Sequence, residues 1–343
     1  MAGELIPPIP DPQKEERLVL IRRQAEEYGR LNKPGIRPAG APFPQATPQS
    51  GYYGRPTLKE PQWKWEIPLY FFVGGAAGAS AVVATVAEWV GRDPELARQA
   101  RLVAVGGSVI SSVLLIKDLG RPDRFLNMLR VFKPQSPMSV GSWILAAFSS
   151  TTAAAAFVDW VQLRYGKNFP ISVAGGAAKG LSAVFALPFS NYTGVLIGAT
   201  AIPVWHRNVK TLPIHFQASG VLASVSLLEL MGYEDNKALN ALGILSTVWE
   251  SWEGFQLESN RDPKLNPLKQ GTSGWITRAG GILSGPLPLG LRVWAALAKP
   301  RRSRKIRRAA ALAGVAGSLL TRYGWVLAGG ASVRQTAGKP EIS

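Results

Sequence analysis

The feature that most constrains this chain is a series of apolar runs separated by polar segments. The runs cover Ile67–Val90, Leu102–Ile116, Val140–Val161, 173–205, Leu212–Met231, Ala238–Phe255, Ile276–Leu297 and Ala309–Gly330. A helix needs about 20 predominantly apolar residues to cross the hydrocarbon core of a bilayer. The pattern therefore predicts an all-α, polytopic membrane bundle of about eight transmembrane helices. We expect the fourth run to be one irregular span, kinked or broken by Pro188 and Asn191.

The polar segments divide the chain into three parts. Residues 1–62 read as a polar, proline-rich tail with a short amphipathic helix at about 12–31, residues 63–333 as the membrane domain, and residues 334–343 as a C-terminal tail. No apolar segment opens the chain, so we expect no cleaved signal peptide. An even number of spans places both ends on one side. The segment Lys299–Arg308 carries seven cations and no acid, which predicts a cytoplasmic loop.

Charge and composition exclude several classes of protein. The formal net charge of +17 would suit a nucleic-acid binder, but the cations lie mostly between apolar runs, where membrane topology explains them. The sequence has no cysteine, which excludes thiolate-bound iron–sulfur clusters in this chain. Its two histidines, His206 and His215, flank one loop, so we expect interfacial histidines, no haem and no metal site.

Several charged residues lie inside the predicted spans, where each costs at least about 2.5 kcal/mol and needs a partner or a water-filled cavity. They are Glu88, Lys179, Glu229, Glu250, Glu253, Arg292 and Arg322. Arg322 is central in its run, and we expect it to pair with a glutamate. Glu229, Glu250, Glu253 and Arg322 are candidates for a proton relay. The alternative for Glu88, Glu253 and Arg292 is that they snorkel to the interface.

The segment KDLGRPDRFLNMLRVFKPQSPMSVGSW, from Lys117 to Trp143, is the strongest local feature. It holds five cations between two apolar runs. Asp118 is placed to cap or pair with Arg121 where the second run ends at glycine and proline. Ser136 and Pro137 are residues typical of a helix start, which predicts that the third span begins there.

Three segments resemble the hallmark sequences of one family of membrane subunits. PQWKWEIPLYFFVGGAAGAS, KDLGRPDRFLNMLRVFKPQSPMSVGSW and PFSNYTGVLIGATAIPVWH occur in that order and are similar to the NrfD and polysulfide-reductase family, over about Trp63 to Met231. The resemblance implies an eight-span anchor without redox cofactors of its own. Such a subunit binds a quinone, menaquinone or ubiquinone, and exchanges electrons with an iron–sulfur subunit. That partner serves a catalytic subunit, often a molybdopterin enzyme, at the prokaryotic cytoplasmic membrane.

The resemblance also points to residues for the quinone site. Polar residues at the start of the first span and a tyrosine of the fourth line that site in the family, and the matching positions are Glu66, Tyr70 and Tyr192. Many relatives have a histidine or asparagine in the first span, and this chain has neither. Asp118 and Arg121 would shape the mouth of the site. We expect no catalytic residue in the usual sense, because the chain would work only within its complex.

The cations of the same loop suggest a docking surface. Arg124, Arg130 and Lys133 would face the iron–sulfur subunit, which would also explain why they depart from the positive-inside pattern. Two other functions stay open: a proton-translocating subunit of a respiratory complex, and a secondary transporter, which would show paired broken helices in two repeated halves. The terminal substrate, the direction of electron transfer and the quinone type are not encoded in these features.

Overall fold

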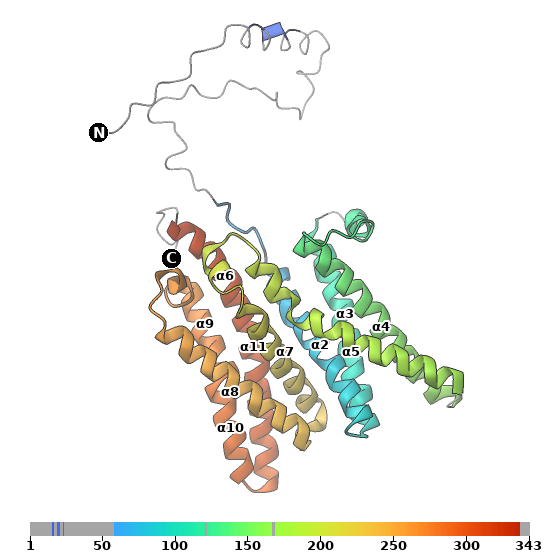
Figure 1. Cartoon of the computed structure of the whole chain (residues 1–343). Helices are drawn as coiled ribbons and strands as arrows, with labels where there is room; N and C mark the ends of the chain where they lie inside the picture. The colour runs from blue at the N-terminus through green and yellow to red at the C-terminus, as the bar shows by residue number, and fades with distance from the viewer. Residues whose placement is uncertain are drawn as a thin grey trace. The chain divides into compact units, whose positions relative to one another are not determined.

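The computed structural model of this chain describes residues 58–120, 122–166 and 169–336, together with residues 16, 19, 20 and 23. The chain divides into two units, Met1–Arg55 and Pro56–Ser343, and the second contains the helical bundle (Figure 1). The predicted N-terminal tail and its amphipathic helix lie almost wholly outside the described residues. The same is true of Arg121, of the side chain of Arg124, and of residues 337–343.

The bundle is built from helices, and no strand occurs among the residues that the structure describes. The helices are α2 (Glu66–Trp89), α3 (Pro94–Asp118), α4 (Pro137–Tyr165), α5 (Phe169–Gly198), α6 (Pro203–Arg207), α7 (Leu212–Leu228), α8 (Lys237–Ser259), α9 (Gly271–Ser284), α10 (Pro286–Leu297) and α11 (Pro300–Thr336). The 3-10 helices η1 (Pro122–Leu129) and η3 (Pro263–Leu268) lie in connections, and a π-helical turn η2 (Glu229–Tyr233) extends α7.

Five helical segments are long and apolar enough to cross a membrane. They are Glu66–Trp89, Pro94–Asp118, Pro137–Tyr165, Pro170–Gly198 and Leu212–Tyr233, and they match the first five predicted runs. The later runs are helical too, but α9 and α10 are only 14 and 12 residues long, and α8 and α11 are not among the segments apolar enough to cross a membrane. The chain is thus an all-helical, multi-pass membrane protein, and the count of eight spans stays a prediction.

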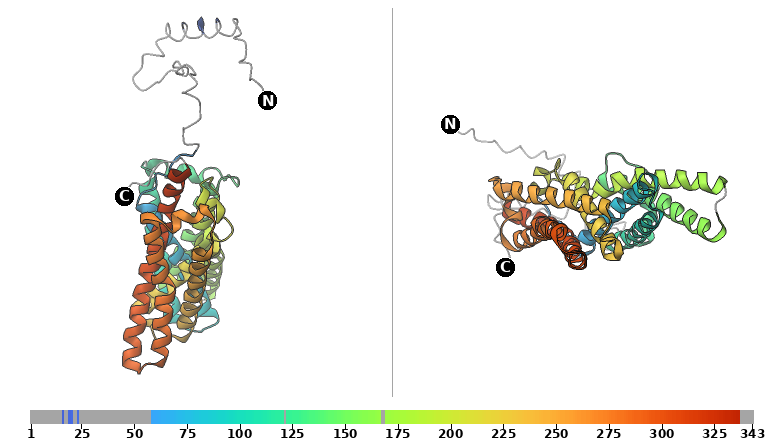
Figure 2. Two further views of the ribbon diagram at one scale, coloured as in Figure 1. Left: turned by 90° about the vertical axis from the view of Figure 1, so that its left-hand side faces the viewer. Right: turned by 90° about the horizontal axis from the view of Figure 1, so that it is seen from below.

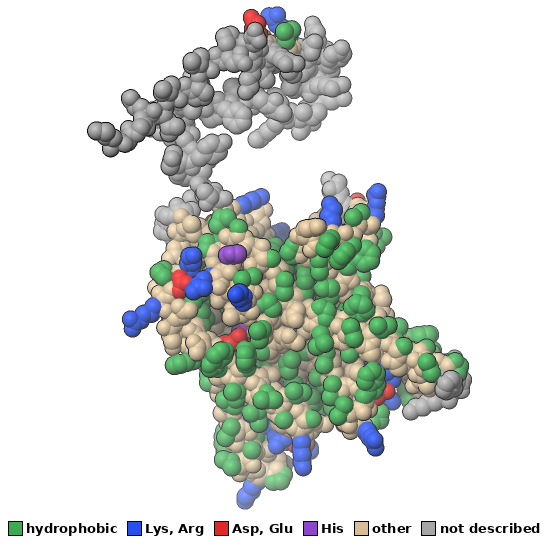
Figure 3. Space-filling view, viewed as in Figure 1, with side chains coloured by type: hydrophobic (Ala, Val, Ile, Leu, Met, Phe, Trp, Pro, Cys, Tyr) green, Lys and Arg blue, Asp and Glu red, His purple; other side chains and the backbone are tan. Residues whose placement is uncertain are grey.

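The surface of the bundle agrees with a membrane location. Figure 3 shows hydrophobic side chains across the middle of one face, with lysine and arginine gathered mainly toward its two ends. Exposed apolar residues occur on most long helices, for example Val113 at 58%, Phe157 at 63% and Leu245 at 66%. Such side chains are costly in water and favourable against lipid, whereas cations favour the interfaces.

Local sequence explains where the helices begin. Asp93 accepts a hydrogen bond from the backbone N–H of Leu96 at 3.0 Å, and Pro94 occupies the first helical position of α3. The Ser136 hydroxyl accepts from the N–H of Ser139 at 3.4 Å, directly before Pro137 of α4. Side-chain caps of this kind satisfy N–H groups that the helix leaves unpaired. The helix start predicted at Ser136 and Pro137 is confirmed.

The fourth span is interrupted at a different place from the one expected. Helix α5 continues through Pro188 and ends at Gly198, and α6 starts only at Pro203. Close packing helps to hold the helix through the proline, because a Cβ atom on Gly78 of α2 would lie 2.9 Å from the carbonyl oxygen of Ala186. The seventh run is broken at Gly285, directly before Pro286, so it forms α9 and α10.

The helices form two neighbouring groups that meet along α2 and α7. Helix α2 packs against α3, α5 and α7, and α4 packs against α5, while α11 packs against α9, α10 and α7. Figures 1 and 2 show α2–α5 on one side of the bundle and α8–α11 on the other. At the junction the backbones of Gly75 and Gly220 come so close that a Cβ on Gly220 would lie 2.9 Å from the Gly75 carbonyl oxygen. Small residues permit this approach.

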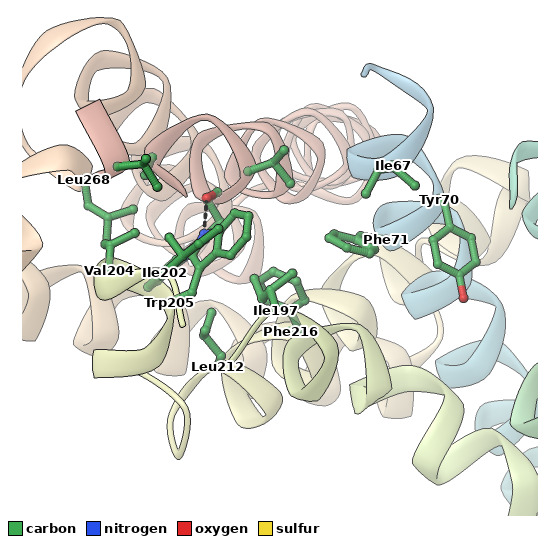
Figure 4. Packing of buried hydrophobic residues seen from close by; sticks show 14 of the residues in the cluster. Ile67, Tyr70, Phe71, Ile197, Ile202, Val204, Trp205, Leu212, Phe216 and Leu268 are labelled. Carbon is green, nitrogen blue, oxygen red and sulfur yellow. Dashed lines mark hydrogen bonds between the residues drawn. The ribbon is translucent and has the colours of Figure 1, made fainter. Parts of the chain in front are cut away.

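A cluster of buried side chains ties the two groups together at one end. Figure 4 shows Phe71 of α2 and Phe216 of α7 facing Trp205 of α6. The Trp205 indole N–H donates to the carbonyl oxygen of Trp325 at 2.7 Å, which fastens α6 to α11. A Cβ on Gly329 would lie 2.0 Å from the Trp205 ring, so only glycine leaves room for this indole.

Candidate functional site

The residues predicted to bind quinone meet at one end of the first helical group. Glu66 is the first residue of α2 and Tyr70 lies one turn later, and both are buried. Asp118 ends α3. The neighbouring Lys117 places its Nζ 3.4 Å from Glu66 Oε1. The ends of α2 and α3 are therefore joined through an ion pair, whereas Arg121 cannot be placed.

Tyr192 of α5 faces the start of α4. Its hydroxyl donates a hydrogen bond to the carbonyl oxygen of Pro137 at 2.7 Å, and the residue is only 5% exposed. The ring lies against Gly141, where a Cβ would be 1.8 Å from Tyr192 Cζ. A cavity of about 410 Å³ adjoins this helix start, between η1 and α4, and Arg130, Lys133, Met138 and Ser142 are among its lining residues.

Three buried oxygen atoms near these residues have no hydrogen-bond partner in the described part of the chain: Glu66 Oε2, Ser111 Oγ and Thr193 Oγ1. Ser111 faces Gly74, one turn along α2 from Tyr70, and Thr193 follows Tyr192. Buried polar atoms in proteins nearly always have partners, so these three are available to a bound hydroxyl, carbonyl or water. Sequence reasoning missed Ser111 and Thr193, since a serine or threonine in a span usually bonds its own backbone.

The predicted relay residues fall into two separate groups. Glu229 forms a two-point ion pair with Arg292 of α10, at 2.5 and 2.8 Å, and both side chains are fully buried. Arg292 therefore does not snorkel. A Cβ on Gly243 would lie 2.5 Å from its guanidinium, so glycine makes room for this pair. Each carboxylate oxygen of Glu229 thus accepts a hydrogen bond from an N–H of Arg292.

Glu250 and Glu253 form the second group together with His215. His215 Nδ1 lies 2.5 Å from Glu253 Oε2 and 3.9 Å from Glu250 Oε1, and the Ser284 hydroxyl donates to Glu250 Oε2 at 2.9 Å. His215 is partly buried in the first turn of α7, where it pairs with Glu253, and its interfacial position stays a prediction. The three donor groups lie within 4.8 Å of one another, a set that can accept a proton or a divalent cation.

Arg322 does not form the expected ion pair with a glutamate within the described residues. Its Nη2 donates to the carbonyl oxygen of Phe216 at 2.6 Å, and the guanidinium lies 3.9 Å from the centroid of the Phe216 ring. A carbonyl and an aromatic face thus take the place of a carboxylate. Through Phe216, Arg322 lies beside His215 rather than beside Glu229.

A third charged group joins the first four helices at the opposite end of the bundle. Lys179 Nζ lies 2.6 Å from Glu88 and 2.8 Å from Asp159, and Arg101 lies 2.5 Å from Glu88 and 2.6 Å from Asp159. Two cations and two carboxylates from α2, α3, α4 and α5 therefore neutralise one another. Glu88 is held in this group and does not simply snorkel.

The cations expected to dock a partner lie outside the helical core. Arg130 and Lys133 are exposed, between η1 and α4. The Lys133 backbone N–H donates to the Ser139 hydroxyl at 3.1 Å, which fixes this connection to the first turn of α4. Exposed apolar residues accompany them, including Leu126 at 71% and Phe132 at 53%. The connection thus presents both cations and apolar side chains.

Comparison with known proteins adds one finding. Residues 57–238 match the model of a family described as "Polysulphide reductase, NrfD". The matched range includes α2 to α7 and every residue of the predicted quinone site, whereas Glu250, Glu253 and Arg322 follow it. No curated protein matches the chain.

Proposed function

Because the chain belongs to the NrfD family, whose members are membrane subunits linked to quinone-interacting electron transfer in oxidoreductase complexes, we propose that it is the quinone-binding anchor of such a complex. The observation that carries the proposal is the group of buried residues Glu66, Tyr70 and Tyr192, in which Glu66 Oε2 has no hydrogen-bond partner among the described residues, together with the unpartnered Ser111 Oγ next to Gly74 of α2. A quinone supplies two-electron, two-proton chemistry, and a site for its ring needs an apolar slot and a few polar atoms.

Each residue of this site has a chemical role in the proposal. Glu66 Oε2 accepts a hydrogen bond or a proton from a quinol hydroxyl, since it is buried and free of partners among the described residues. Tyr70 and Tyr192 orient the ring by hydrogen bonds and by packing. Lys117 holds the other oxygen of Glu66, so the carboxylate keeps one orientation. Asp118 lies at the mouth, where it would pass protons to water.

We propose that the connection between η1 and α4 is the docking surface for the iron–sulfur subunit. Arg130 and Lys133 are exposed next to the cavity that adjoins Pro137, so a docked iron–sulfur subunit would stand close to the ring site. The chain itself has no cysteine, so a redox partner must supply the clusters. A catalytic subunit of molybdopterin type and a place in the prokaryotic cytoplasmic membrane complete the proposal.

The test uses the intact complex purified through a tag on this chain. We expect an extractable quinone, and co-purifying subunits that contain iron. Glu66→Gln and Tyr70→Phe should lower quinol-dependent electron transfer at least tenfold, whereas Glu95→Gln and Tyr233→Phe, at the other end of the bundle, should not change it. A complex with neither quinone nor an iron-containing partner would overturn the proposed function.

One observation favours a second function, proton translocation. His215 with Glu253 and Ser284 with Glu250 form two hydrogen-bonded pairs, with His215 Nδ1 3.9 Å from Glu250 Oε1, and this partly buried group can exchange protons. Turnover that depends on membrane potential in the parent and not in Glu250→Gln would support this function. Potential-independent turnover in vesicles would exclude it without affecting the quinone site.

A further inference from the structure

A second cavity lies in the other half of the bundle, between α7, α8, α9 and α11. Its volume is about 370 Å³, and none of Glu66, Tyr70, Asp118 or Tyr192 lines it. Leu212, Leu257, Leu265 and Trp325 are among its apolar lining residues. Most of its lining residues follow residue 238, where the family match ends. Binding sites for organic molecules are typically cavities of this size, mostly apolar, with a few convergent polar groups.

The convergent polar groups are His215, Glu250 and Glu253. Glu250 is 3% exposed, and its Oε1 has no hydrogen-bond partner in the described part of the chain. His215 Nε2 also has no hydrogen-bond partner among the described residues, while Nδ1 of that ring is hydrogen-bonded to Glu253. One carboxylate oxygen and one ring nitrogen are therefore left for an occupant. A single cation would use these atoms but would leave most of the volume and the apolar walls unfilled.

The cavity has both a lipid-facing and a water-facing side. Trp252, a lining residue, is 52% exposed, and Phe255 on the same helix is 68% exposed, which is the character of a surface against lipid. Figure 3 shows acidic side chains among hydrophobic ones partway down the face of the bundle. A wider cavity of about 750 Å³ shares Asn208, Thr211, Asn260 and Leu265 with the inner one.

The outer cavity differs in character from the inner one. Its lining includes His206, Arg207, Lys210 and Lys264, which makes it a cationic mouth at the end of the bundle. The inner cavity thus lies between the acyl chains on one side and water on the other. Among small molecules, an amphiphile with a polar ring and an apolar tail matches both surroundings.

We propose that this inner cavity binds the ring of a lipid-soluble quinone or quinol, as a second site separate from that of Tyr70 and Tyr192. A ring oxygen contacts Glu250 and His215, the ring packs against Trp325, and the tail leaves past Trp252 into lipid. The proposal rests on the proposed function only in that both sites draw on the same pool of quinone. It assigns binding to this cavity and no electron transfer.

The test measures how many quinone analogues bind to each purified complex. The probe is 2-heptyl-4-hydroxyquinoline N-oxide, whose fluorescence is quenched on binding, and we expect two molecules per chain. Gly281 lines the cavity, and a Cβ there meets no atom within 4 Å, so Gly281→Leu fills the space without a backbone clash. We expect this variant to bind one molecule. Gly254→Leu, which fills the same cavity from α8, should do the same.

The matched control is Gly290→Leu. Gly290 also has open space around its Cβ but is not a lining residue of this cavity, so two molecules should still bind. If Gly281→Leu and Gly254→Leu both still bind two molecules of the probe, the second site is overturned. If one molecule binds to the parent and only Glu66→Gln removes it, the second site is wrong and the proposed function stands. If neither the parent nor any variant binds the probe, the second site is wrong, and the analysis of the purified complex for quinone and iron still decides the proposed function.

Discussion

At the scale of single residues, glycines decide which side chains can occupy the predicted quinone site. Gly141 is the clearest case, because the Tyr192 ring fills the space where any other residue would have its Cβ. The phenol is therefore held between α4 and α5 by contact as well as by its hydrogen bond to Pro137. Sequence inspection finds Tyr192 through its motif but finds Gly141 only as one glycine among 36.

Gly141→Ala should therefore displace Tyr192. Overpacking of this kind costs about 1–3 kcal/mol of unfolding free energy, and we expect quinol-dependent turnover to fall at least tenfold. Unfolding in detergent and steady-state kinetics of the complex measure the two effects. Gly106→Ala is the control, since a Cβ there has open space, and it should leave both unchanged. Normal turnover in Gly141→Ala would remove Tyr192 from the site.

The buried pair of Glu229 and Arg292 is a second case at this scale. Removing one partner leaves an unpaired buried charge, so Arg292→Leu should lower the unfolding free energy by about 3–5 kcal/mol. The double variant Glu229→Leu with Arg292→Leu should recover most of that loss, because no charge is left behind. Thermal unfolding of the parent, Arg292→Leu and the double variant in detergent measures these differences in stability. Equal stability of the single and double variants would show that the pair is not electrostatically coupled.

At the scale of helices, the sequence predicted where they exist better than where they break. Apolar runs mark α2, α3, α4, α5 and α7 because burial and lipid exposure act on every turn. Pro188 does not break α5, which packs closely on Gly78 of α2 there. The actual interruption at 199–202 depends on Trp205, whose indole bonds to Trp325, 120 residues away. No local pattern contains that contact.

The short helix α6 gives a prediction at this scale. Trp205→Phe removes the N–H that donates to the Trp325 carbonyl, and the loss of this hydrogen bond should cost about 0.5–1.5 kcal/mol locally. We expect faster amide hydrogen exchange in residues 199–210, with little change in α3 and α4. Uniformly faster exchange across the bundle would mean that Trp205 stabilises the whole domain rather than α6. Val195→Ala, at a lipid-exposed position of α5, serves as the control.

We expect the connection after α8 to respond to pH. Arg207 Nε lies 2.5 Å from Asp262 Oδ2, and this bond holds the pKa of Asp262 below its usual range. A carboxyl whose pKa is lower in the folded state stabilises the contact above its unfolded pKa of about 3.9, and the contact is lost as the pH falls through the folded pKa. Hydrogen exchange of η3, corrected for intrinsic rates, should rise below pH 4. Asp262→Asn should remove this pH dependence.

At the scale of the whole molecule, the fold class, the family and the existence of the first five membrane helices could be predicted from sequence. Residue types and spacing carry that information. The grouping of charges could not be predicted, because each group joins helices far apart in the chain: Glu229 meets Arg292, and His215 meets Glu253. Two histidines with unremarkable neighbours give no sign that one of them pairs with a glutamate of another helix.

Partner docking is also a property of the whole assembly. Reversing charge with Arg130→Glu and Lys133→Glu should weaken association with the cluster-bearing subunit about tenfold, mainly through a slower association rate, and less so at high salt. Surface plasmon resonance at two salt concentrations measures this. Arg164→Glu, at the other end of α4, should have no effect. Unchanged association in the double variant would place the docking surface elsewhere.

The group of Glu88, Arg101, Asp159 and Lys179 has a consequence for how the protein is made. Its charges come from four successive helices. When α2 and α3 enter the bilayer, Glu88 can pair with Arg101, but Asp159 of α4 then adds a second negative charge. The charges of the group balance only when α5 contributes Lys179. A ribosome stalled after α4 would present a nascent chain with a surplus aspartate in lipid. We therefore expect the first three spans to pack stably only after the fourth has emerged.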